Sequence, residues 1–174
     1  MEEIIVTYKT KTYIAAEWTG DHDAVEQLHK WNNSNYWGLN FHDAHELTQA
    51  RDTSLNCTIK SSLKRRMDVS KCFILIVGNN TKTVRAGSCQ YCASYNGFRC
   101  IRGYSADSRS YIEYECDEAI KAGIKIVVLY NAATVDKNKC PDVIKNIGTH
   151  VAMKTKVGYN SYTWNYEAVK KALQ

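Results

Sequence analysis

Proline is scarce in this chain, with one residue among 174. That scarcity argues against a proline-rich linker, and an apolar fraction of 44% argues against disorder. No apolar run approaches the roughly 18 residues that a membrane-spanning helix needs, so we expect no membrane partner. The opening residues, MEEIIVTYKTKTY, are acidic and lack the apolar core and cleavage site of a secretory signal. Together these absences favour one cytoplasmic domain spanning residues 1–174.

Three common site motifs are also missing. The sequence contains neither a GxGxxG dinucleotide fingerprint nor a GxxxxGK[ST] phosphate-binding loop, so a Rossmann cofactor site and a P-loop are not indicated. It also lacks the GxSxG turn that presents the nucleophile of α/β-hydrolases. Any catalytic role must therefore rest on side chains outside these motifs.

Apolar periodicity predicts an α/β fold. Short apolar runs typical of buried strands occur at residues 12–18, 37–41, 72–77, 124–130 and 150–153. Helical spacing of apolar residues predicts helices at residues 23–31, 55–67, 110–123, 141–147 and 164–173. Asp23 and Glu26 form a capping-box pattern at the start of the first helix. The alternation predicts a single three-layer domain, with a central, mostly parallel sheet of about five strands and helices on both faces.

This topology also predicts where a ligand binds. In parallel α/β sheets the ligand crevice lies beyond the carboxyl ends of the strands. The segments after Trp18, Phe41 and Val77 should therefore face the site. The start of the helix at Ser110 should face it too.

Residues 82–109 lack a sustained apolar period and interrupt the alternation as an insertion. A segment this long without secondary structure is usually functional, so we expect it to cover the site as a lid or to fold away from it. It holds Cys89, Cys92 and Cys100, whose spacing makes them candidate zinc ligands. No fourth ligand is evident nearby, which favours free loop thiols in a reducing compartment and no bound metal.

The sequence HDAHE at residues 42–46 offers a second possible metal site. HxxH can bind zinc, but the zincin spacing is missing and the segment ends a predicted strand. We favour a loop in which one carboxylate, Asp43, faces a ligand.

A basic run lies on the helix predicted at residues 55–67. Its outer face is expected to carry Lys60, Lys64, Arg65 and Arg66, and the net charge of the chain is +5. Because no aromatic residues interleave with these charges, a solvated helix face is favoured over a nucleic-acid partner.

The helix predicted at residues 110–123 combines clear ends with two acidic residues beside its apolar stripe. Ser110 is a suitable N-cap, and Gly123 is placed to end the helix. Glu113 and Glu115 border opposite edges of the stripe formed by Ile112 and its helical neighbours. A half-buried carboxylate beside an aromatic ring is typical of active sites, whereas a glutamate that flanks the core and pairs with lysine is the alternative. Periodicity alone does not choose between the two glutamates.

Several motifs, in order, resemble one family. SKCFILIVGNNT at residues 70–81 is similar to the family pattern S-x-x-x-I-x-x-I-G-x-x-T. RSYIEYECDEA at residues 109–119 is similar to its pattern S-x-W-V-x-Y-E-I-x-x-A. An aspartate-containing loop follows the first strand, and Phe41 and Asp43 end the second. The chain resembles the TIR-like domains of the bacterial Thoeris antiphage system, relatives of Toll/interleukin-1 receptor domains, over roughly residues 12–155 apart from the insertion.

The resemblance implies a flavodoxin-like fold. It also implies an enzyme that cleaves the nicotinamide–ribose bond of NAD⁺. The product would be an ADP-ribose-type signal, cyclic in several members, used in antiphage defence. Glu115 falls on the family's catalytic glutamate, and NAD⁺ is then a substrate, with no cofactor implied. The expected substrate-binding residues are Trp18, Asp21, Asp43 and Tyr111. The implied partners are NAD⁺, further copies of the chain through TIR surfaces, and a downstream effector that senses the product.

Two other functions stay open at this point. One is a non-catalytic TIR-like domain that signals by assembly. The other is a nucleoside deoxyribosyltransferase-like enzyme, in which a glutamate attacks the sugar directly.

Overall fold

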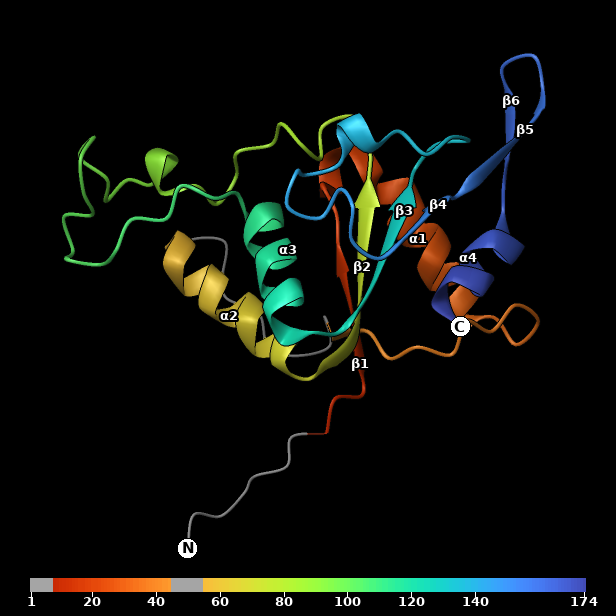
Figure 1. The fold of residues 1–174 in the computed structure, drawn as a ribbon, viewed down its shortest axis with the longest axis horizontal. Helices are drawn as coiled ribbons and strands as arrows, with labels where there is room; N and C mark the ends of the chain where they lie inside the picture. The colour runs from red at the N-terminus through yellow and green to blue at the C-terminus, as the bar shows by residue number, and fades with distance from the viewer. Residues whose placement is uncertain (1–7, 45–54) are drawn as a thin grey trace, which may run out of the picture.

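The computed structural model describes residues 8–44 and 55–174. Its centre is a parallel sheet in the order β1-β2-β3-β4. The strands are β1 (Lys11–Ala15), β2 (Ser70–Val77), β3 (Lys125–Tyr130) and β4 (Thr149–Ala152). Helices α2 (Asn56–Asp68) and α3 (Tyr111–Ala122) cover one face, and α1 (Trp18–Asn33) and α4 (Tyr166–Leu173) cover the other (Figure 1). The expected three-layer α/β domain with a parallel sheet is confirmed.

Two cores lie on opposite sides of the sheet because successive strand residues point to opposite faces. In β2, Phe73 and Leu75 join the core under α2 and α3, whereas Ile74 and Ile76 join the core under α1 and α4. Both faces of β2 and β3 are therefore buried, as their continuous apolar runs predict.

Helix α3 has the ends that its sequence predicts. The Ser110 side chain accepts from the Glu113 backbone N–H, and the Glu113 carboxylate accepts from the Ser110 N–H, which completes a capping box. Gly123 ends the helix in the left-handed conformation, with φ of 64°. These caps fix the rotation of α3, which turns Ile112, Cys116 and Ala119 into the core.

The strand expected at residues 37–41 is wrong. The side chain of Asn32 binds both the N–H and the C=O of Phe41, which are the groups that a strand would use for pairing. Gly38 and Asn40 also adopt positive φ, which breaks the extended conformation. Only an isolated parallel bridge between Thr12 and Asp43 remains beside β1, so the described sheet has four strands instead of about five.

The first helix begins earlier than expected. The Glu17 carboxylate accepts from the N–H groups of Thr19 and Gly20 and so caps α1 at Trp18. The expected capping box at Asp23 is therefore not the start of the helix. Asp21 has non-helical φ and ψ of −117° and 18°, which leaves a kink inside the first turns.

The chain after β3 also differs from expectation. Residues 141–147 form turns in place of a helix, and Ile144 is buried while Val143 and Ile147 are partly exposed. A short 3₁₀ helix, η3 (Lys137–Lys139), precedes them. An antiparallel hairpin that was not expected, β5 (Lys154–Gly158) and β6 (Ser161–Trp164), projects from the domain (Figure 1). Its strands are mostly exposed, so they carry no strong apolar signal.

The C-terminal helix is confirmed, but it begins later than the expected residue 164. Asn165 caps α4, and the helix begins at Tyr166. Its buried residues are Tyr166, Val169 and Ala172. Trp164, expected on this helix, ends β6 instead.

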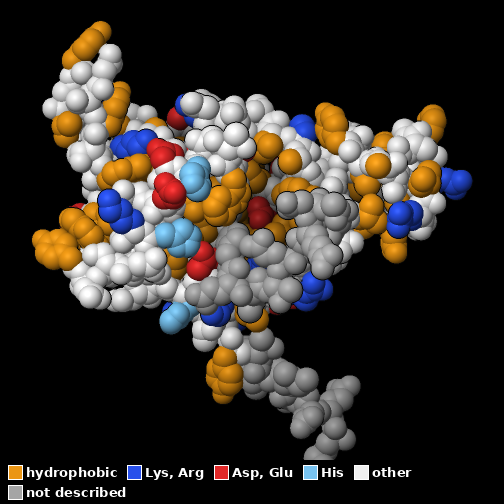
Figure 2. All heavy atoms as spheres, turned by 180° about the vertical axis from the view of Figure 1, so that it is seen from behind, with side chains coloured by type: hydrophobic (Ala, Val, Ile, Leu, Met, Phe, Trp, Pro, Cys, Tyr) orange, Lys and Arg blue, Asp and Glu red, His pale blue; other side chains and the backbone are white. Residues whose placement is uncertain are grey.

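Most of the insertion extends away from the sheet and ends in exposed hydrophobic side chains (Figures 1 and 2). It contains one short 3₁₀ helix, η2 (Cys89–Tyr91), and the Phe98 side chain is 92% exposed. The middle of the insertion therefore extends outward instead of folding over the helices as a lid, whereas its two ends contact α2 and α3. Within the described ranges, no helix is both long and apolar enough to cross a membrane.

An ionic cluster connects the C-terminal end of the insertion to α2 and α3. Arg109 forms ion pairs with Asp107 at 2.9 Å and with Asp117 of α3 at 2.7 Å. Lys60 of α2 lies 3.2 Å from Asp107 and donates to the Arg109 carbonyl at 2.8 Å. Lys60 is only 4% exposed, so its expected place on the solvated outer face is wrong. Burial opposes ionisation of Asp107, but hydrogen bonds from Arg109 and Lys60 outweigh it and lower the Asp107 pKa to about 2.

Replacing Asp107 should destabilise the domain at neutral pH. The folded pKa lies below the ordinary value of about 3.9, so the stabilisation is present above pH 4 and lost as pH falls toward 2. We expect Asp107→Asn to lower the free energy of unfolding by roughly 1 kcal/mol at pH 7, allowing for solvent screening. Urea denaturation at several pH values measures this. Asp68→Asn, which breaks an exposed pair with Lys64, is the control. Equal stability of Asp107→Asn and wild type across this range contradicts the assignment.

Candidate active site

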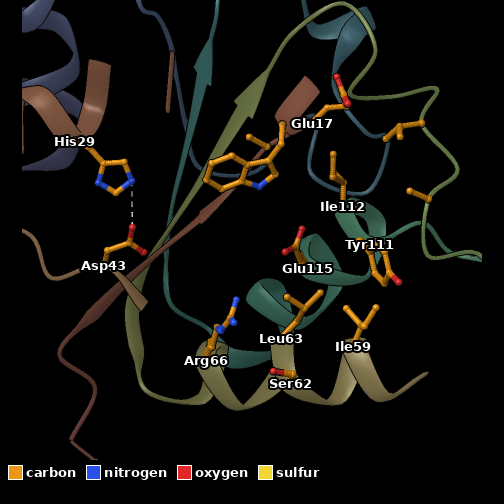
Figure 3. Close-up of a pocket in the computed structure, with 14 residues that line it drawn as sticks. Glu17, His29, Asp43, Ile59, Ser62, Leu63, Arg66, Tyr111, Ile112 and Glu115 are labelled. Carbon is orange, nitrogen blue, oxygen red and sulfur yellow. Dashed lines mark ion pairs between the residues drawn. The ribbon is translucent and has the colours of Figure 1, made fainter. Parts of the chain in front are cut away.

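A cavity of about 630 Å³ lies where β1 ends, between α2 and α3 (Figure 3). This volume falls in the range of about 300–1,000 Å³ that is typical of small-molecule sites. On the face of the molecule that lies behind the view of Figure 1, hydrophobic side chains border a hollow (Figure 2). The described residues that line the cavity are Ala16, Glu17, Trp18, His29, Asp43, Ile59, Ser62, Leu63, Arg66, Val84, Ala86, Tyr111, Ile112 and Glu115.

Glu115 contributes a buried carboxylate to this cavity. The side chain comes from the second turn of α3, and the residue is 8% exposed. The hydroxyl of Tyr13, a fully buried residue of β1, donates to Glu115 Oε1 at 2.5 Å. Burial and the negative charge of Glu115 raise the pKa of Tyr13 well above its usual value. Tyr13 therefore stays protonated and holds the carboxylate in place as a hydrogen-bond donor.

Tyr111 forms a fixed wall of the cavity. Its hydroxyl donates to Asn56 Oδ1 at the start of α2, at a distance of 3.0 Å. Its ring packs against Gly87, where a Cβ would lie only 2.5 Å from a ring carbon. Gly87 also has φ of 94°, which side chains rarely adopt. Glycine is therefore required here to let the insertion pass the ring.

The opposite side of the cavity carries an acid–histidine pair and an indole. His29 Nε2 lies 3.2 Å from Asp43 Oδ2, and the Asp43 side chain is 12% exposed. The isolated bridge to Thr12 sets Asp43 beside β1. Trp18, the first residue of α1, is 47% exposed and supplies an aromatic face that a ligand can reach. The cavity thus combines carboxylates with aromatic surfaces.

A family match covers the part of the chain that builds most of these walls. Residues 12–86 match the family model described as Thoeris protein ThsB, TIR-like domain. These residues are therefore similar to that TIR-like domain. A search of curated proteins found no significant match. The match ends before α3, so the positions of Tyr111 and Glu115 in the TIR-like domain rest on the structure and on the motif at residues 109–119.

The structure brings four of the expected site residues to one cavity, namely Trp18, Asp43, Tyr111 and Glu115. Asp21 does not line it. The Asp21 carboxylate accepts from Asn131 Nδ2 at 3.0 Å and packs so closely on Gly78 that a Cβ there would clash. Burial, opposed by the Asn131 hydrogen bond, raises the pKa of Asp21. Asp21 thus links the start of α1 to the ends of β2 and β3.

The candidate zinc ligands are not assembled into a site. Among the described residues, no group of three or more His, Cys, Asp or Glu side chains is arranged to hold a metal ion. Cys89, Cys92 and Cys100 are free thiols. Of the HDAHE segment, His45 and Glu46 lie outside the described residues.

Sequence reasoning missed the contribution of α2. Arg66 was expected on the solvated face, but it is 4% exposed and lines the cavity with Ile59, Ser62 and Leu63. The spacing contains a usable signal, because Arg66 follows Ile59 by seven residues and Leu63 by three and so shares their helical face. His29 was missed because its partner Asp43 is distant in sequence.

The bond between Tyr13 and Glu115 can be measured by a double-mutant cycle. Tyr13→Phe keeps the ring that packs on Phe73 and removes only the hydroxyl. We expect it to lower the free energy of unfolding by about 1.5–3 kcal/mol, since the acceptor is a buried carboxylate. Chemical denaturation of both single variants, with Glu115→Gln as the second, and of the double variant should give a coupling of about 1 kcal/mol or more.

Tyr114→Phe combined with Glu115→Gln is the matched control. Tyr114 directly precedes Glu115 on the same helix, and its ring contacts Lys60 and Arg109. Its effect should add to that of Glu115→Gln. Additive effects for the Tyr13 pair as well contradict a specific Tyr13–Glu115 interaction.

Proposed function

We propose that this TIR-like domain cleaves the nicotinamide–ribose bond of NAD⁺ and forms an ADP-ribose-type product. The observation that carries the proposal is the buried Glu115 carboxylate, held by Tyr13 in a cavity of suitable size. The match to the TIR-like family of Thoeris protein ThsB supports the same reading.

The chemistry needs little more than one well-placed carboxylate. As the bond between ribose C1′ and the nicotinamide nitrogen breaks, its electron pair goes to nicotinamide, which leaves as a neutral base without an acid. Positive charge then develops on the ribose as an oxocarbenium-like state, which the negative carboxylate of Glu115 stabilises. Water attacks C1′ to give ADP-ribose and releases a proton, or a nucleophile elsewhere in the same molecule attacks C1′ to give a cyclic product.

Other residues that line the cavity bind the substrate. The exposed face of Trp18 stacks on a ring of the substrate, and Tyr111 contributes a second aromatic wall. Asp43, paired with His29, accepts hydrogen bonds from ribose hydroxyls. Asp21 is left out of this scheme because it does not line the cavity.

The biological setting follows from the family. We propose that the product serves as a cytoplasmic signal in antiphage defence, read by a separate effector protein. Copies of the chain would associate through TIR surfaces to reach the active state.

Glu115→Gln should abolish most turnover. Glutamine keeps the size of the side chain but removes the charge that stabilises the oxocarbenium-like state, so we expect nicotinamide release to fall by at least about 10²–10³-fold. Mass spectrometry of the products that purified protein forms from NAD⁺, at low and at high protein concentration, measures this. The control is Glu113→Gln on the same helix, because glutamine preserves the capping box.

The same assay separates the other functions. Equal rates in Glu115→Gln and Glu113→Gln would remove Glu115 from catalysis. Self-association without turnover would favour a non-catalytic assembly domain. A glycosyl adduct on Glu115 with deoxynucleosides, and no NAD⁺ turnover, would favour a deoxyribosyltransferase-like enzyme.

A further inference from the structure

Helix α2 brings a positive charge to the cavity that holds Glu115. Arg66 is 4% exposed and lines the cavity, and its guanidinium points from α2 into the space between Asp43 and Glu115 (Figure 3). A guanidinium keeps its charge in proteins and carries five N–H donors. The cavity therefore contains a buried cation as well as carboxylates.

Among residues 8–44 and 55–174, this cation has no ion pair of the kind that neighbouring basic residues form. Within the described residues, Arg66 Nε is buried without a hydrogen-bond acceptor, and no ion pair includes Arg66. On the same helix, Lys60 pairs with Asp107 and Lys64 with Asp68. A buried donor left unsatisfied is uncommon in folded proteins, and a catalytic role or a bound ion or water are among its explanations.

The position of Arg66 is nevertheless well defined. It lies in the last turn of α2, where the helix dipole favours positive charge. Its carbonyl accepts from the buried Ser70 hydroxyl at 2.7 Å, which ties the helix end to the start of β2. The dipole offsets part of the charge but provides no acceptor for Nε. The backbone at Arg66 is thus fixed, and among the described residues the Nε–H donor of its side chain has no acceptor.

We propose that Arg66 binds the diphosphate group of a dinucleotide substrate. This inference rests on the proposed function and deepens it, because it assigns the phosphate-binding part of the same cavity. The planar fork of arginine matches two phosphate oxygens, and such charge-assisted pairs are the strong hydrogen bonds of proteins. In NAD⁺ the diphosphate is attached to the nicotinamide ribose through its C5′ atom. Arg66 and Glu115, which line the same cavity, then bind neighbouring parts of one NAD⁺ molecule, the diphosphate and the nicotinamide ribose.

Binding of ADP-ribose and adenosine to the purified full chain, measured by calorimetry, tests this assignment. Arg66→Gln should weaken ADP-ribose binding about ten- to a hundredfold and leave adenosine binding unchanged, because adenosine lacks phosphate. Arg66→Lys should fall between wild type and Arg66→Gln, because it keeps the charge and loses the fork. Arg65→Gln, which removes the exposed neighbouring charge, should bind like wild type.

Thermal unfolding without ligand separates a binding role from a structural one. Removing a buried charge that has no acceptor should not lower the midpoint of Arg66→Gln. A marked fall of the midpoint in this variant would show a structural role and overturn the proposal. Unchanged ADP-ribose affinity in Arg66→Gln, or no affinity in wild type, would overturn it as well.

The two proposals can fail separately. Glu115-dependent NAD⁺ turnover combined with Arg66-independent ADP-ribose binding would overturn only the phosphate site. Arg66-dependent ADP-ribose binding without any NAD⁺ turnover would support the phosphate site and overturn the proposed reaction.

Discussion

The hydrogen bond from Tyr13 to Glu115 joins the two parts of the molecule on which the site depends. Tyr13 belongs to β1 and is packed in the core against Phe73, while Glu115 belongs to α3, a hundred and two residues later. The bond satisfies a carboxylate in a buried place where an isolated charge is costly. It also explains why a glutamate next to the core stripe is compatible with a stable helix. The capping box and Gly123 then fix the rotation of α3 that brings the carboxylate to the cavity.

The rest of the cavity is arranged around that carboxylate by separate segments. Gly87 lets the chain pass Tyr111, and the cluster of Lys60, Asp107 and Arg109 closes the base of the insertion beside α3. The middle of the insertion extends outward from this cluster (Figure 1). Arg66 adds a buried cation to the same space. A carboxylate for a developing positive charge and a cation for phosphate are what a dinucleotide substrate requires.

The sequence predicts the parts of this fold that depend on local signals. Ser110 and Gly123 mark the ends of α3, and continuous apolar runs mark β2 and β3. The strand expected at residues 37–41 fails because the side chain of Asn32 takes the backbone groups of Phe41, a contact that periodicity does not contain. Arg66 was misplaced because a basic residue on a helix is usually solvated, whereas this one shares the apolar face of Ile59 and Leu63 and is buried. The choice of Glu115 over Glu113 came from the family motif, since both border the same stripe.

A structure of the full chain bound to a non-cleavable NAD⁺ analogue would show whether Glu115 acts on the nicotinamide ribose. We expect this ribose to lie within hydrogen-bond distance of the Glu115 carboxylate, in the cavity between α2 and α3. An analogue bound outside this cavity, or with its nicotinamide ribose turned away from Glu115, would contradict it.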